Sequence, residues 1–309
     1  MSLRRTTART SVSRLATFSS IALLASITLT QPAAADPLAP DRVATSACGT
    51  LLSEAEIGTV AALSDTSTIT APTPIDRLED EVDRQQRISE ILTSHGDRRG
   101  LFGIGLDAVV QQAVMPLQRD PAAFAVPAWA HAISTDLLRR YLDNVHAEFT
   151  GTPAEPAWQR YFDLTRDCAL SPARVAMIGY NAHLTVDLAR AVAATGTTDR
   201  NVPDYYKIVD SIATDGDAIV TRTKAAYGAD LGPLWRFYFV GEGLDRLAGE
   251  GVASELLLRA ADSGYNTLTL ANGFALQNPQ IAPAATAEME ALWGTADGAI
   301  ELLTRLGGL

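Results

Sequence analysis

The sequence predicts an all-α protein, and three observations support this fold class. Apolar residues recur at helical spacing in successive runs, and proline or glycine separates one run from the next. The period-two alternation that is typical of strands is confined to residues 265–270. With 47% apolar and 20% charged residues, the chain can bury a core, which excludes disordered and collagen-like proteins.

The first 35 residues have the pattern of a secretory signal peptide. Four arginines and no acidic residue accompany an apolar run at residues 15–29, and the small residues Ala33 and Ala35 form a cleavage pattern before Asp36. The run is shorter than the roughly 20 apolar residues of a membrane span. We therefore expect cleavage after about Ala35 and an extracytoplasmic protein with no stable membrane span after cleavage.

The net charge limits the classes of binding partner that we expect. The precursor carries a formal −11, and removal of the four arginines leaves 21 basic and 36 acidic residues, which is a formal −15. Nucleic-acid binding depends on clustered lysine and arginine, so nucleic acid is not expected as a partner. A small-molecule or lipid ligand is compatible with this composition, and the oligomeric state stays open.

The chain has two cysteines, Cys48 and Cys168, and an even pair in an oxidising compartment predicts one disulfide. On the chain-entropy model, closing a loop of about 120 residues stabilises a fold by ~4 to 5 kcal/mol. Residues 36–72 are rich in Ala, Thr, Ser and Pro, and we expect a flexible lead-in there with a short helix near residues 53–63.

The helical domain is predicted over residues 73–309. Its first helix is capped by Thr73, has Pro74 at the first helical position and ends at Gly96. Proline and glycine then divide the remaining chain into further helices, predicted at 99–117, 127–150, 156–168, 172–195, 203–227, 231–249, 252–277 and 284–306. This gives a single domain of about eight to nine helices around a central buried helix at 172–195.

The central helix carries the candidate site. Nearly every residue from 175 to 194 is apolar or small, which is typical of a helix surrounded by other helices. Polar residues interrupt this run, and His183, Asp187 and Arg190 have the i, i+4, i+7 spacing that puts them in one row. A buried row of this kind must be hydrogen-bonded, because unpaired buried polar groups cost several kcal/mol.

The same helix carries a resemblance. Its sequence Asn181-Ala182-His183-Leu184-Thr185-Val186-Asp187-Leu188 resembles the Asn-Ala-His-(Ile or Leu)-x-x-Asp-Leu helix of a bacterial helical family with a domain of unknown function. The similarity covers roughly residues 75–275. It is supported by the Gly96-to-Phe102 stretch, the Pro156-Ala157-Trp158 step and the stretch that contains Trp235. The resemblance implies a helical fold and importance for Asn181, His183 and Asp187, and it implies no reaction.

Two enzymatic hypotheses follow from these residues. In the first, His183 and Asp187 are two ligands of a divalent metal, and Asp215 and His131 on other helices are the candidates to complete it. In the second, no metal is needed, because Asp187 orients His183 as a general base, with Asn181 as a third catalytic candidate. The signatures G-x-S-x-G, H-E-x-x-H and G-x-x-x-x-G-K-[ST] do not occur.

Three non-enzymatic alternatives stay open. The row His183, Asp187 and Arg190 can be a structural hydrogen-bonded row that fixes helix packing. The chain can also be a binding protein for an apolar ligand, which the aromatic residues of the stretch 235–239 favour slightly. An envelope protein kept soluble by its acidic exterior is the third. Weighing these, we predict a hydrolase-like activity at His183 and Asp187, with a small-molecule or lipid-binding protein as the alternative.

Overall fold

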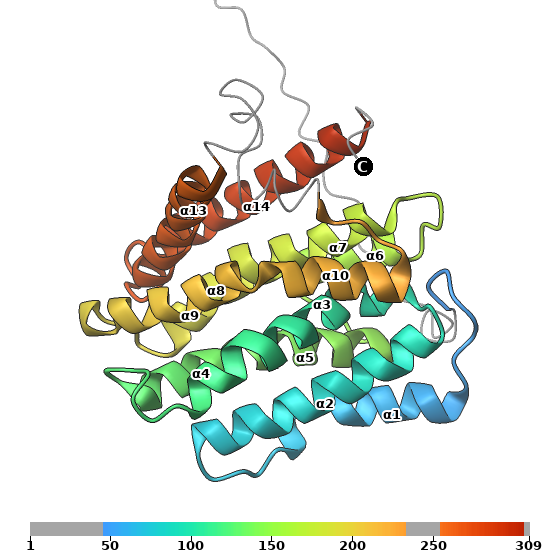
Figure 1. The fold of residues 1–309 in the computed structure, drawn as a ribbon, viewed down its shortest axis with the longest axis horizontal. Helices are drawn as coiled ribbons and strands as arrows, with labels where there is room; N and C mark the ends of the chain where they lie inside the picture. Colours follow the sequence, from blue (N-terminus) through green and yellow to red (C-terminus); the bar gives the residue numbers. More distant parts are fainter. Residues whose placement is uncertain (1–45, 233–253, 306–309) are drawn as a thin grey trace, which may run out of the picture. The chain divides into compact units, whose positions relative to one another are not determined.

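The computed structural model describes residues 46–232 and 254–305, which form helices (Figure 1). These residues contain no strand, so the all-α prediction is confirmed. The predicted signal peptide at 1–35 lies outside the described residues. So do nearly all of the helix predicted at 231–249 and the aromatic residues at 235–239.

Proline marks the beginning of many helices, as the sequence predicts, because its fixed φ suits the first helical turn. It lies in the first turn of α2, α4, α5, α6, α7 and α9. The α-helices are α1 (Glu54–Ser64), α2 (Pro74–Ser94), α3 (Leu101–Val109), α4 (Met115–Arg119), α5 (Pro127–Thr150), α6 (Pro156–Thr165), α7 (Pro172–Asn181), α8 (Leu188–Ala194), α9 (Val202–Thr214), α10 (Gly216–Tyr227), α13 (Ser254–Leu276) and α14 (Ala282–Arg305).

Three predicted helices, those at 99–117, 172–195 and 203–227, are subdivided. The helix predicted at 203–227 is α9 followed by α10, because the chain leaves helical geometry at Asp215, with φ −100° and ψ 15°. The central helix predicted at 172–195 is a continuous run of α7, the π-helical segment η5 (Ala182–Asp187) and α8. A second π-helical segment, η4 (Val110–Val114), connects α3 to α4.

The described part of the expected lead-in, residues 46–72, differs from a flexible segment. Helix α1 begins with a capping box between Ser53 and Glu56, and it buries Val60 and Leu63 beside α2 and α5. The predicted disulfide between Cys48 and Cys168 is confirmed, and it links this segment to the chain after α6. The sequence predicted a short helix near residues 53–63, and α1 lies there. Composition did not predict its packing against α2 and α5, because Ala, Thr and Ser are common in exposed loops.

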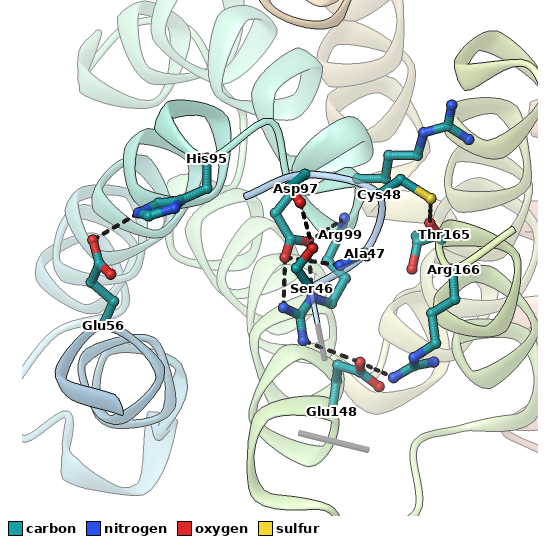
Figure 2. Close-up of polar contacts among 12 residues, drawn as sticks. Ser46, Ala47, Cys48, Glu56, His95, Asp97, Arg99, Glu148, Thr165 and Arg166 are labelled. Atoms are coloured by element: carbon teal, nitrogen blue, oxygen red, sulfur yellow. Dashed lines mark hydrogen bonds and ion pairs between the residues drawn. The ribbon is translucent and has the colours of Figure 1, made fainter. Parts of the chain in front are cut away.

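A buried ion cluster lies beneath the disulfide-linked segment (Figure 2). Nε and Nη2 of Arg99 donate to the two carboxylate oxygens of Asp97, at 2.9 and 2.6 Å, and the third guanidinium nitrogen lies 3.6 Å from Glu148. Glu148 also pairs with Arg166. The backbone N–H of Ala47 donates to Asp97 at 3.3 Å, so the segment covers charges that are almost completely buried. Removing one member of such a cluster leaves a buried charge unpaired.

Helix α3 can pack in the core because two glycines within it and one just before it leave room for three tyrosine hydroxyls. A Cβ placed on Gly103 would lie 2.7 Å from the hydroxyl of Tyr141, and one on Gly105 would lie 2.0 Å from that of Tyr180. A Cβ placed on Gly100, just before α3, would lie 2.3 Å from the hydroxyl of Tyr227. The helical stretch Arg98–Arg119, which contains α3, is the one described helix that is long and apolar enough to cross a membrane, and most of it is buried within the protein. It is therefore a core helix here.

Glu81 gives the fold a testable pH dependence. This side chain on α2 is 2% exposed, and burial, opposed in part by Arg139, raises its pKa from 4.5 to about 8. Between pH 4.5 and about 8, the folded state therefore holds a proton that the unfolded state has released. The contribution of Glu81 to the free energy of unfolding is present in full below pH 4.5 and is lost as the pH rises to about 8.

We predict that Glu81→Gln is more stable than the wild type at pH 8. Between pH 4.5 and about 8, the free energy of unfolding of the wild type should fall by about 1.4 kcal/mol per pH unit. Glu81→Gln should not show this fall. Urea denaturation at several pH values measures this. Glu79→Gln, an exposed glutamate on the same helix, is the control and should keep the wild-type slope. Equal slopes in all three proteins would contradict the prediction.

Candidate functional site

The centre of the buried helix departs from α-helical geometry at the candidate residues. His183 and Asp187 both lie in the π-helical segment η5, and they are 4% and 1% exposed. A π-helical segment is uncommon and frequently occurs at functional sites, because the wider turn changes the direction of its side chains. The feature supports a functional interpretation of this helix and gives no reaction by itself.

Asp187 accepts hydrogen bonds from two rings. The indole nitrogen of Trp158, on α6, donates to Oδ2 of Asp187 at 2.8 Å. Nδ1 of His183 lies 3.3 Å from the same oxygen. Because a buried carboxylate without donors is costly, these two contacts compensate its removal from water. Asp187 therefore connects α6 to the central helix.

The same contacts define the state of the imidazole. A carboxylate accepts only, so in neutral His183 the proton belongs on Nδ1 and Nε2 carries a lone pair. The ring packs against Phe102 and Trp158, with centroids 5.0 and 6.3 Å apart. Among the described residues, none forms a hydrogen bond with Nε2. The site therefore presents one oriented acceptor.

His183 lines an apolar cavity of about 80 Å³. The walls come from α2, α3, η4, α5, α7, η5, α9 and α10, so the cavity lies at the junction of the helices around η5. Aliphatic and aromatic carbon makes up nearly all of the wall, and the residues with polar side-chain groups are Ser134, Tyr180 and His183. The lining residues are Leu78, Phe102, Leu106, Val109, Val110, Val114, Ser134, Leu137, Leu138, Tyr180, His183, Leu184, Ile208, Ile212 and Ile219.

Comparison with known proteins places this helix in a family. A family model described as a family of unknown function, DUF5995, matches residues 78–250, which is more than half of the chain and includes α7, η5 and α8. The chain belongs to the DUF5995 family. No curated protein matches the chain. No solved structure matches it either. Membership in DUF5995 identifies no reaction, so the chemistry depends on the residues.

Other predicted members of the site have different partners in this DUF5995 protein. Asn181, predicted as a third catalytic residue, donates from its amide to the carbonyl of Trp293 on α14 at 2.9 Å, and its side-chain oxygen accepts from Thr185 at 2.8 Å. The contact with Trp293 joins α14 to the central helix, and the contact with Thr185 lies within the central helix. Arg190 pairs with Glu155 before α6, instead of with Asp187 as a continuous polar row would require.

The predicted metal set is not assembled among the described residues. His131 donates from Nε2 to the carbonyl of Gln118 at 3.1 Å, and Asp215 accepts from Gln112 at 3.3 Å. Among the residues whose side chains the structure describes, 46–232, 265–302 and 304–305, no group of three or more His, Cys, Asp or Glu could hold a metal ion. The hypothesis that His183, Asp187, Asp215 and His131 share one metal is therefore corrected, because spacing within one helix does not show which faces of other helices approach it.

Trp158 is the site residue that sequence reasoning missed. The sequence marks it only through the Pro156-Ala157-Trp158 step, and its contact with Asp187 joins residues 29 positions apart. An aromatic residue in an amphipathic helix predicts burial, but it does not predict which carboxylate the indole meets. The sequence did not predict the cavity wall for the same reason, since residues from several helices form it.

We predict that Trp158→Phe lowers the free energy of unfolding by about 1.5 to 3 kcal/mol, because Asp187 loses a donor to a charged group. Trp129→Phe is the matched control. It removes an indole bond of 3.1 Å to the neutral hydroxyl of Thr197, which costs about 0.5 to 1.5 kcal/mol. Chemical denaturation measures both changes. Equal losses would show that the charge of Asp187 does not matter at this site.

Proposed function

We propose that this DUF5995 protein binds a small, mainly apolar molecule in the cavity beside His183. The observation that carries the proposal is the composition of the wall, where carbon groups surround one oriented imidazole. Binding sites for small molecules combine an apolar lining with few convergent polar groups in this way. A volume of about 80 Å³ favours a small molecule over a complete lipid.

The predicted hydrolase-like activity is the second candidate, and the contact between Asp187 and His183 supports it. That pair is the arrangement in which a carboxylate orients a general base. A nucleophile is the missing component. Ser134 is the hydroxyl residue on the same wall besides Tyr180, and its oxygen accepts a hydrogen bond from Gln118 at 2.9 Å. Binding accounts for the site without a nucleophile and is therefore preferred.

We further propose that the protein works outside the cytoplasm. The pattern of residues 1–35 supports export. The disulfide between Cys48 and Cys168 is compatible with secretion, because such bonds persist in oxidising compartments.

The binding proposal is tested with xenon, a small apolar probe. We expect ¹H–¹³C spectra under xenon pressure to show methyl shifts of Leu106, Ile212 and Ile219, which line the cavity. Ile212→Phe should abolish these shifts, because the larger side chain fills the space. Val209→Phe is the control on the same helix, outside the cavity wall, and should keep them.

Two results would count against binding. Absence of shifts in the wild type would contradict an accessible apolar cavity. Turnover of a short-chain ester that is lost in His183→Gln and retained in Ile212→Phe would replace binding with the hydrolase alternative.

A further inference from the structure

His183 lines the apolar cavity, and the hydrogen-bonding state of its imidazole restricts the chemistry of the ligand. Of the polar lining residues, Tyr180 already has interaction partners within the protein. The Ser134 oxygen accepts from Gln118. His183 is 4% exposed, and among the described residues no hydrogen bond reaches its Nε2. A hydrogen bond to this nitrogen stabilises a bound donor, so a ligand that supplies a donor is favoured here over one that does not.

The direction of this hydrogen bond is fixed by Asp187. Because Asp187 accepts from Nδ1, neutral His183 offers a lone pair at Nε2 and no proton. The ligand must therefore donate. Asp187 is itself held by the indole of Trp158, so rotating the ring to reverse this polarity would break the contact between His183 and Asp187. A ligand with only acceptor atoms forms no hydrogen bond with Nε2 of neutral His183.

The volume sets the size of the ligand. An apolar cavity of about 150 Å³ holds benzene, which has six heavy atoms. By proportion, the cavity of about 80 Å³ holds about three or four heavy atoms. Most of these atoms must be carbon, because Leu106, Val110 and Ile212 offer no hydrogen bond.

We propose that the cavity selects short-chain aliphatic alcohols, with the alcohol O–H donating to Nε2 of His183 and the alkyl group packed against the aliphatic wall. This inference rests on the proposed binding function and adds the chemical class of the ligand. It makes His183 the specificity residue and Asp187 a positioning residue that keeps Nε2 as an acceptor.

A pair of isomers tests the class. 1-Propanol and methoxyethane contain the same atoms, but only the alcohol has an O–H to donate. We expect NMR titration of the full chain to show that 1-propanol binds about three- to tenfold more tightly than methoxyethane, the range that one neutral hydrogen bond gives. In His183→Leu, which keeps the wall apolar, the two isomers should bind equally. The ¹⁵N resonance of Nε2 in the wild type should respond to 1-propanol alone.

The outcomes separate this inference from the binding proposal. Equal affinity of the isomers in the wild type, with xenon still bound, would overturn the alcohol inference and leave apolar binding intact. Failure of xenon and both isomers to bind would overturn both. Preference for the alcohol that persists in His183→Leu would also overturn the inference, because the donor would then be recognised elsewhere.

Discussion

The burial of the Asp187 carboxylate is the constraint on which the centre of the molecule depends. A carboxylate that is 1% exposed needs donors, and it receives them from Trp158 on α6 and His183 one turn earlier on the central helix. These contacts join two helices and determine which imidazole nitrogen holds the proton. Which imidazole nitrogen of His183 can accept a hydrogen bond therefore depends on the contact between His183 and Asp187.

The packing around this group leaves little freedom to rearrange. Phe102 on α3 touches the rings of Trp158, Tyr180 and His183, with centroids 5.0 to 5.1 Å away. α3 can lie this close to its neighbours because its glycines leave room for tyrosine hydroxyls. The disulfide-linked segment covers a second group of buried charges around Arg99, away from the His183 pair in sequence and with its own partners. Charge burial is thus compensated separately in two places.

The sequence predicted most of the fold because its information is local. Proline positions, caps such as Thr73 and helical spacing each act within one or two turns, and they located α2, α5 and α7 closely. The paired cysteines predicted the disulfide. The site was predicted only in part: spacing placed His183 beside Asp187, because both belong to one helix. It did not predict the π-helical geometry, the donor Trp158 or the separation of His131 and Asp215 from a shared site, since these depend on how distant helices pack.

The tautomer of His183 tests the central claim most directly, because the oriented acceptor follows from the contact with Asp187. Long-range ¹H–¹⁵N correlation spectra distinguish a protonated ring nitrogen from one that carries a lone pair. We predict that neutral His183 is protonated at Nδ1 and has a lone pair at Nε2. Protonation at Nε2, or rapid exchange between the two tautomers, would contradict the role assigned to Asp187.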